Sequence, residues 1–314
     1  PGTEDREPLD TRLSLKKVIA FETINSHQLI DQHEAAISAG SNSPLLTDYN
    51  IQQNDIATIV YTSGTTGPPK GVLQTHKNHL ANVRQALESG IVGEGMSIML
   101  FLPLAHSFAR LMSLIGLLSP STIMLPAIVD KTSSRLVPSS VMRDIKELNA
   151  NVVPLVPRFL EKMQEGIQAK ANMYSVKAAL LRLTITAGQR VWEAKKQGRA
   201  SGTVARILFD GTAPIRAGIK RQLFGDRFRY AVSGGAKLNL SVAEFFEALD
   251  ILILEGYGLT ETCVATNVNL IETRKIGSVG KVMAADIELK LEEDGEILFR
   301  GPNITSGYHN RQSA

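Results

Sequence analysis

The chain has few of the residues that mark secreted, metal-binding or nucleic-acid-binding proteins. Cys263 is the only cysteine among 314 residues, which excludes an internal disulfide and any zinc site built from several cysteines. The 34 basic and 31 acidic residues are spread along the chain, without the lysine and arginine block that follows a phosphate backbone. We therefore predict a protein of a reducing, cytoplasmic compartment that does not bind nucleic acid.

A clear membrane-spanning segment is also lacking. Residues 111–129, LMSLIGLLSPSTIMLPAIV, are uncharged and nearly long enough to cross a bilayer. However, Ser119-Pro120-Ser121 interrupts this run and Pro126 follows, so the sequence predicts a core helix, a turn and a buried strand instead. No basic start followed by an apolar core is present at the N-terminus, and we predict no signal peptide.

Short apolar, β-branched runs alternate with helical patterns along a chain that is 43% hydrophobic and 21% charged. This alternation predicts an α/β fold with largely parallel sheets and helices on both faces. Strands are expected at 18–21, 56–61, 97–102, 122–125, 152–156, 228–232 and 251–254. Helices are expected at 76–88, 107–118, 140–149, 157–171, 216–223 and 241–249. Residues 172–204 are basic and weakly patterned, which predicts an amphipathic excursion on the surface.

The hydrophobic pattern of the sequence changes after residue 275. Ile287, Leu289 and Leu291 alternate with polar residues, and Asp294-Gly295 separates them from a second apolar run, which predicts an antiparallel hairpin. We therefore expect an α/β core over 1–275 and an incomplete β-rich subdomain over 276–314.

The segment YTSGTTGPPKGV at 61–72 follows the apolar run IATIV and precedes a helix expected to begin near Thr75. Its three glycines allow close backbone approach, so that successive N–H groups can surround an anion, while four hydroxyls and a lysine add donors and charge. It is not a P-loop: counting from Gly64, the second glycine position is Pro69, and Lys70 is followed by Gly71. The loop predicts polyphosphate binding by Thr62, Ser63, Gly64, Thr65, Thr66, Gly67 and Lys70.

Four further motifs follow in order: LPLAHSFAR at 102–110, SGGAKL at 233–238, EGYGLTET at 255–262 and GEILFRGPNITSGYHN at 295–310. With the phosphate loop, they resemble the adenylate-forming superfamily of acyl-CoA synthetases, peptide-synthetase adenylation domains and beetle luciferases. The string VPRFLEKMQEGIQAKA at 156–171 is most similar to bacterial long-chain fatty acyl-CoA synthetases. The resemblance implies the large-domain core of an adenylate-forming enzyme, in which the α/β core over 1–275 would be the nucleotide- and acyl-binding core.

This resemblance implies roles for individual residues. Glu261 would bind Mg²⁺ with Thr62 nearby, and Thr260 would contact the α-phosphate of ATP. The ring of Tyr257 and the small Gly235-Ala236 segment suit the two faces of an adenine. His106 would border the place where the substrate carboxylate meets the α-phosphate. The implied catalytic residues are His106, Lys70, Thr260 and Glu261, and Gly258 is added to the nucleotide-binding set.

The substrate expected from the resemblance is an apolar carboxylic acid. Amino-acid-activating relatives place an aspartate near 102–110 to bind the substrate ammonium, and this chain has none there. The acyl-pocket candidates are Phe101, Leu104, Phe108 and Gly234. The implied reaction is ATP-dependent formation of an acyl-adenylate and then of acyl-CoA, with Mg²⁺ and with coenzyme A as co-substrate. Two alternatives stay open: an acyl-AMP ligase that serves a carrier protein, and a non-catalytic ATP-binding module. Peripheral membrane contact and a homodimer also stay open.

In the superfamily, the pattern continues with a ribose-binding aspartate, a hinge and a small mobile C-terminal domain that carries an essential lysine. None of these occurs within residues 1–314, and only about 55 residues precede the phosphate loop. We therefore expect a fragment that lacks the C-terminal domain and part of the N-terminal region. It should bind ATP·Mg²⁺ but form adenylate slowly or not at all by itself.

Overall fold

The computed structural model describes residues 50–62, 68–126 and 138–310. Contacts divide the chain into a unit of residues 1–52 and a unit of residues 53–314. The fold described below is that of the second unit. The strand expected at 18–21 lies outside the described residues.

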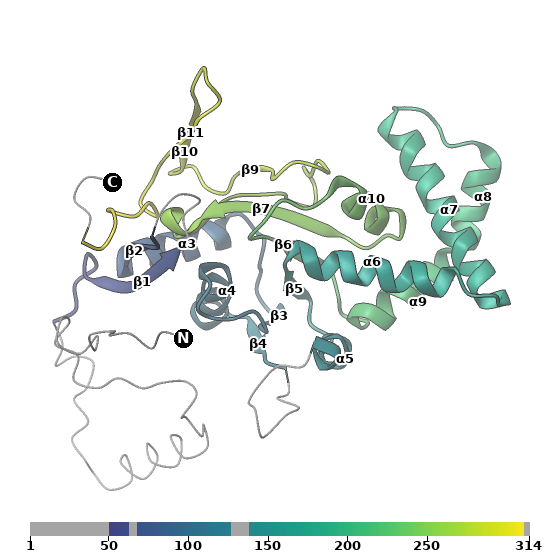
Figure 1. The fold of residues 1–314 in the computed structure, drawn as a ribbon, viewed down its shortest axis with the longest axis horizontal. Coiled ribbons are helices and arrows are strands. Elements are labelled where there is room, and N and C mark those ends of the chain that lie inside the picture. Colours follow the sequence, from purple (N-terminus) through teal and green to yellow (C-terminus); the bar gives the residue numbers. More distant parts are fainter. Residues whose placement is uncertain (1–49, 63–67, 127–137, 311–314) are drawn as a thin grey trace, which may run out of the picture. The chain divides into compact units, whose positions relative to one another are not determined.

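A seven-stranded sheet forms the centre of this unit, in the order β4-β3-β5-β6-β7-β8-β9 (Figure 1). The strands β4, β3, β5, β6 and β7 are parallel, as the sequence predicted, whereas β8 and β9 add antiparallel pairs at one edge. The strands are β3 (Ser97–Met99), β4 (Thr122–Met124), β5 (Val152–Leu155), β6 (Tyr230–Ser233), β7 (Ile253–Leu259), β8 (Val264–Val268) and β9 (Lys281–Val282).

Helices cover both faces of the sheet. They are α3 (His76–Glu88), α4 (Ser107–Leu118), α5 (Pro138–Leu148), α6 (Pro157–Ala171), α7 (Val176–Lys196), α8 (Thr203–Gly211), α9 (Ala213–Phe224) and α10 (Leu240–Ala248). One apolar cluster joins the sheet to α5, α6, α9 and α10, and the other joins it to α3 and α4. Neighbouring residues of one strand enter different clusters, as Val152 and Val153 do, because successive side chains point to opposite faces. This explains the continuous apolar runs in the sequence.

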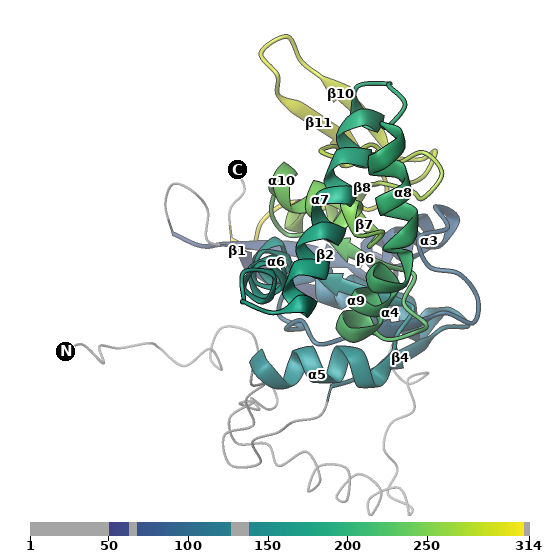
Figure 2. The ribbon, with the colours of Figure 1, turned by 90° about the vertical axis from the view of Figure 1, so that its right-hand side faces the viewer.

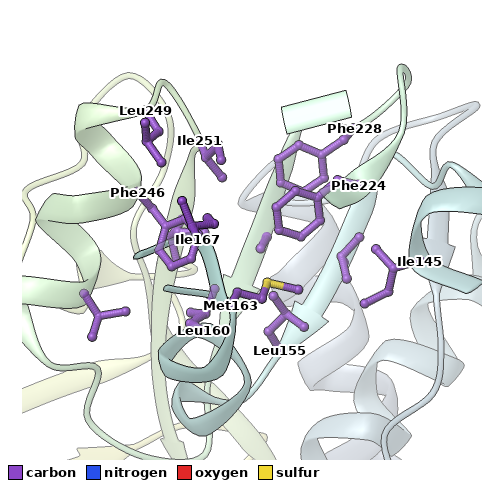
Figure 3. Packing of buried hydrophobic residues seen from close by; sticks show 14 of the residues in the cluster. Ile145, Leu155, Leu160, Met163, Ile167, Phe224, Phe228, Phe246, Leu249 and Ile251 are labelled. Carbon is purple, nitrogen blue, oxygen red and sulfur yellow. The ribbon is translucent and has the colours of Figure 1, made fainter. Parts of the chain in front are cut away.

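Figure 3 shows the packing of the first cluster. Leu160, Met163 and Ile167 project from one side of α6, at the spacing of a single helical face. Phe224 and Phe228 stack with ring centroids 4.0 Å apart. The helix expected at 157–171 therefore packs one apolar face into the core.

The basic region 172–204 contains a long helix that was expected only as a surface excursion. Ser175 caps α7 by accepting a hydrogen bond from the Ala178 N–H at 3.1 Å. The helix α7 packs against α10 so closely that a Cβ on Gly188 would lie 2.0 Å from the Ala248 carbonyl oxygen. The helix α8 was not predicted, and it lies beside α7 (Figure 2).

The strand before the phosphate loop differs from the expectation. It is β1 (Ile56–Thr62), and it pairs antiparallel with β2 (Lys70–Thr75) in a separate two-stranded sheet, with Thr62 opposite Lys70. The connection of residues 63–69 is too short for a parallel crossover, which needs a dozen or more residues, so the chain returns as an antiparallel neighbour. The helix α3 then begins, as expected, after the N-cap Thr75.

The predicted C-terminal hairpin is confirmed. The strands β10 (Glu288–Leu291) and β11 (Ile297–Arg300) pair antiparallel, and Gly295 adopts a φ of 88° in their turn. The boundary between 275 and 276 stays a prediction. Residues 111–124 form the expected helix, turn and strand, but the strand was expected to be buried and β4 instead lies at the edge of the sheet, with Thr122 exposed and Ile123 and Met124 only partly buried. Within the described ranges, no helix is long and apolar enough to cross a membrane.

Candidate functional site

Three of the sequence motifs lie at the carboxyl ends of parallel strands. LPLAHSFAR at 102–110 follows β3 and leads into α4, SGGAKL at 233–238 begins with the last residue of β6, and EGYGLTET at 255–262 extends from β7 into the 3₁₀ turn η3 (Thr260–Thr262). Ligands of open α/β sheets bind at this edge. The sheet topology therefore brings segments 150 residues apart in the sequence to one edge.

The hairpin β1–β2 is joined to the same region by the C-terminal segment 305–309. The Leu73 N–H donates to the Gly307 carbonyl at 3.1 Å, and the His309 N–H donates to the Gly71 carbonyl at 2.7 Å. On its other side, the Thr305 N–H donates to the Glu261 carbonyl at 2.8 Å. Segment 305–309 thus bridges the strand that starts with Lys70 and the turn that carries Glu261.

Tyr308 contacts two of the predicted site residues at once. Its hydroxyl donates to Glu261 Oε1 at 2.9 Å. The Nζ atom of Lys70 lies 5.1 Å from the centroid of its ring, within cation–π range. Burial and the bond to the Glu261 carboxylate raise the pKa of Tyr308, so its hydroxyl remains a donor at neutral pH. Lys70, Tyr308 and Glu261 therefore form one polar group beside the end of β1.

A buried polar network supports the turn that carries Thr260 and Glu261. Gln74, which is 0% exposed, donates from Nε2 to the Thr260 carbonyl at 2.8 Å and accepts from the Thr58 hydroxyl at 3.0 Å. The Thr58 hydroxyl also lies 3.0 Å from His79 Nε2. This network fixes η3 relative to β1 and β2, the two strands that precede and follow the phosphate loop in the sequence.

His79 and Cys263 form the deeper part of the network. His79 Nδ1 lies 3.4 Å from Cys263 Sγ. Burial, and secondarily the positive charge of Arg110, lower the pKa of His79 to about 4, so the imidazole is neutral at physiological pH. Burial raises the pKa of the Cys263 thiol to about 12. Both groups are structural in this setting rather than reactive.

The adenine-binding candidates are on the same edge of the sheet. The Tyr257 ring is half-buried and stacks against Phe299 of β11, with centroids 6.2 Å apart. Gly235 has a φ of 84°, which favours glycine, and Ala236 beside it is exposed. Gly258 has a packing reason of its own, because a Cβ there would lie 1.7 Å from the Val264 carbonyl oxygen.

The acyl-pocket candidates are not all neighbours. The Phe108 ring packs on Gly234, where an added Cβ would lie 3.4 Å from the ring. Phe101 is buried and contacts Phe159 of α6, with ring centroids 5.4 Å apart. Leu104 is exposed. The structure therefore places Phe108 with Gly234, and Phe101 in a different part of the core.

His106 occupies the N-cap position of α4, is exposed, and makes no side-chain hydrogen bond to the residues that the structure describes. It remains available to a ligand at the carboxyl end of β3. Ser63, Gly64, Thr65, Thr66 and Gly67 lie outside the described residues. Their roles, like those of the other site residues, stay predictions.

A magnesium ion fits the donor set around Glu261 only as part of a nucleotide complex. In the described ranges, no group of three or more histidine, cysteine or acidic side chains could enclose a metal. Glu261 Oε2 makes no hydrogen bond to a described residue, which leaves it free for a cation. Mg²⁺ is commonly held by one or two carboxylates together with substrate phosphates and water. A single carboxylate near a phosphate loop matches that chemistry.

The sequence did not single out Gln74 and Tyr308. Tyr308 lies in the motif 295–310, but nothing in the pattern indicated that its hydroxyl would reach Glu261. Gln74 lies in β2, where nothing in the sequence pattern marks it. The structure shows that it is completely buried and makes two hydrogen bonds. The sequence feature that could have indicated the role of Gln74 is its place between the apolar Leu73 and the helix N-cap Thr75.

Solved structures share this fold. The o-succinylbenzoate CoA synthetase of Bacillus subtilis, crystallised with ATP and a magnesium ion, matches with a TM-score of 0.55 at 23% identity, over 84% of this chain and 45% of that one. The fold is that of the adenylate-forming enzymes. The model of the AMP-binding enzyme family matches residues 3–309, and the chain belongs to this family.

Curated relatives include fatty-acid ligases. A long-chain-fatty-acid–CoA ligase of Mycobacterium bovis is 31% identical over 271 residues, which covers 84% of this chain and 42% of the relative. A chloroplastic long-chain-fatty-acid–[acyl-carrier-protein] ligase of Arabidopsis thaliana is 27% identical over 329 residues, covering 93% of this chain and 43% of the relative. The chain spans less than half the length of these relatives.

Proposed function

We propose that this chain is the nucleotide- and acyl-binding part of a long-chain fatty acid–CoA ligase. The observation that carries the proposal is the contact of Lys70, Tyr308 and Glu261 beside the phosphate loop. Lys70 and Glu261 both contact Tyr308, and this arrangement suits a nucleoside triphosphate and its metal. The lysine attracts phosphate oxygens, and the carboxylate attracts the metal ion.

In the proposed first reaction, a fatty-acid carboxylate oxygen attacks the α-phosphorus of ATP. A new P–O bond forms, the bond to the β-phosphate oxygen breaks, and pyrophosphate leaves. In the second reaction, the thiol of coenzyme A attacks the acyl carbon, AMP leaves, and the thiol proton passes to solvent. The first reaction depends on alignment and charge neutralisation. Lys70 would contact the phosphates. Glu261 would hold Mg²⁺, which when bound would neutralise part of the negative charge of the phosphates.

Tyr308 would act on this chemistry through Glu261. Its hydroxyl bond leaves the second carboxylate oxygen of Glu261 free and fixes the orientation of the first. Gln74 donates a hydrogen bond to the backbone carbonyl of Thr260, the residue next to Glu261. The carboxylate is thereby held before a ligand arrives, which lowers the ordering cost of binding.

The preference for an apolar acid rests on the residues around the end of β3. Phe108 and Gly234 make an apolar contact there, and segment 102–110 contains no acidic residue to bind a substrate ammonium. The names of the relatives support a fatty acid as the substrate class. Transfer to an acyl carrier protein is the second candidate, which the name of the Arabidopsis relative favours. Incubation of the whole enzyme that contains this part with a labelled fatty acid and either acceptor would separate them, because each candidate predicts one thioester product.

The proposal is tested by ATP binding in the presence and absence of Mg²⁺, measured by calorimetry. Glu261→Gln should abolish the Mg²⁺-dependent gain in affinity, while Glu272→Gln, at an exposed glutamate, should leave it intact. Lys70→Met should weaken ATP binding roughly ten- to a hundredfold, the range expected for a bond to a charged group. Lys77→Met, on the exposed side of α3, is its control. Unchanged ATP affinity in Glu261→Gln and Lys70→Met would overturn the assignment.

A further inference from the structure

The hairpin of α7 and α8 carries an apolar surface that the proposed function does not use. Figure 2 shows the two helices side by side, facing the viewer. Seven large apolar side chains on this hairpin and on the turn before it are exposed, Val176 to 79% and Ile207 to 65%. We call them the hairpin surface: Met173, Tyr174, Val176, Leu180, Leu183, Val204 and Ile207.

The spacing of these residues places them away from the core. Val176, Leu180 and Leu183 follow the i, i+4, i+7 spacing of a single face of α7. Ile185 and Gly188 are buried, and Gly188 abuts α10, so another side of α7 packs on the protein. On α8, Val204 and Ile207 follow the i, i+3 spacing of one face, and α8 buries no residue completely. Both helices therefore present an apolar stripe outward in the part of the chain that the structure describes.

The segment that contains the hairpin surface carries mostly positive charge. Residues 170–206 contain eight basic residues and one acidic residue, whereas the whole chain contains 34 and 31. The rest of the chain therefore has an acidic surplus. Lys196 pairs with Glu193 and Glu244, and Arg206 pairs with Asp210. The other basic residues of the segment are Lys170, Lys177, Arg182, Arg190, Lys195 and Arg199, of which Lys195 lies 3.8 Å from Glu247.

We propose that the hairpin surface docks on a lipid bilayer that carries anionic headgroups. The apolar side chains would enter the boundary between headgroups and acyl chains, and the basic residues around them would contact lipid phosphates and carboxylates. Basic residues near an anionic membrane surface each strengthen binding by about fivefold at low salt. This combination of an apolar stripe with basic flanks is the pattern of a helix that lies on a membrane.

The same features disfavour other occupants. A second copy of the chain in a two-fold arrangement would bring two strongly basic segments together, which like-charge repulsion opposes. A nucleic acid would satisfy the basic residues, but its phosphate backbone offers nothing to cover the exposed leucine, valine and isoleucine side chains. A bilayer satisfies both groups at once. This proposal does not rest on the proposed enzymatic function.

Vesicle flotation of the 314-residue chain tests the proposal. We expect binding to phosphatidylcholine vesicles that contain phosphatidylglycerol, weaker binding at high salt, and little binding to phosphatidylcholine alone. Val176→Ser combined with Ile207→Ser should reduce binding by tenfold or more, since two apolar side chains no longer enter the interface. Lys177→Gln combined with Arg199→Gln should reduce it roughly 25-fold.

Matched variants act elsewhere on the surface. Leu117→Ser with Leu125→Ser removes two apolar side chains of similar exposure, and Lys275→Gln with Lys281→Gln removes two exposed charges. Both should bind vesicles like the unaltered chain. Trp192, the only tryptophan, lies on α7, so unchanged emission verifies that each variant keeps the packing of this helix. Absence of vesicle binding, equal losses in the matched variants, or a dimer that the Val176 and Ile207 changes dissociate would each overturn the proposal.

Discussion

Gln74 offers a direct test of how the candidate site is supported. Gln74→Leu keeps a side chain of similar length but removes the donor to the Thr260 carbonyl and the acceptor for the Thr58 hydroxyl. Thr58 keeps its contact with His79, so its loss is small. The Thr260 carbonyl keeps the bond from the Cys263 N–H at 3.2 Å but loses the stronger bond from Gln74, which is completely buried. Because neither partner is left unpaired, the loss is that of ordinary hydrogen bonds, and we expect the free energy of unfolding to fall by about 0.5–1.5 kcal/mol.

Urea unfolding followed by circular dichroism measures this loss, and a thermal scan should show Tm lowered by about 1.5 °C for each kcal/mol. ATP affinity in the presence of Mg²⁺ should fall as well, because the weakened turn carries Glu261. Gln85→Leu is the matched control. Gln85 is also 0% exposed and donates to Asp286 at 3.0 Å, but it makes no bond to Thr260. It should lose comparable stability and keep its ATP affinity.

The reasoning fails if Gln74→Leu changes the free energy of unfolding by less than about 0.5 kcal/mol, the range of ordinary surface substitutions. It also fails if Gln74→Leu and Gln85→Leu lower ATP affinity equally, since the effect would then come from general destabilisation.

Other predictions concern packing, pH and thiol chemistry. Gly188→Ala should destabilise the chain by about 1–3 kcal/mol because its Cβ would meet the Ala248 carbonyl at 2.0 Å, whereas Gly166→Ala, with open space, should stabilise it by about 0.5–1 kcal/mol in urea unfolding. Because the folded-state pKa of His79 is about 4, below the ordinary 6.5, the unfolded chain binds more protons between these values; stability should therefore fall as pH decreases through this window. Cys263 is 1% exposed, and a colourimetric thiol reagent should react with it only after denaturant is added.

Each of these has a discriminating control. If Gly166→Ala and Gly188→Ala shift stability in the same direction, the close contact of α7 with α10 is wrong. His79→Gln should flatten the pH dependence between 6.5 and 4 relative to His309→Gln, and equal profiles would refute the assignment. Rapid reaction of Cys263 in the native protein would contradict its burial.

The parallel sheet and most of its helices could be predicted from the sequence, because these elements are local patterns. Continuous apolar runs such as Val152–Leu155 need burial on both faces, and the stripe of Leu160, Met163 and Ile167 can face only a core. The strand expected at 251–254 lies ahead of Thr260 and Glu261, and the observed β7 extends to Leu259, directly before them. By contrast, the sequence did not indicate that the phosphate loop closes an antiparallel hairpin, because pairing depends on the length of the connection and on the available neighbours.

The tertiary structure decided which distant residues meet. Tyr308 reaches Glu261, 47 positions earlier, because segment 305–309 extends the β1–β2 hairpin. Gln74 reaches Thr260, 186 positions away, through burial that no local pattern reveals. The sequence by itself determined that this chain has the residues of an adenylate-forming enzyme. The structure decided how Glu261 is held, since hydrogen bonds between segments far apart in the chain depend on packing rather than on periodicity.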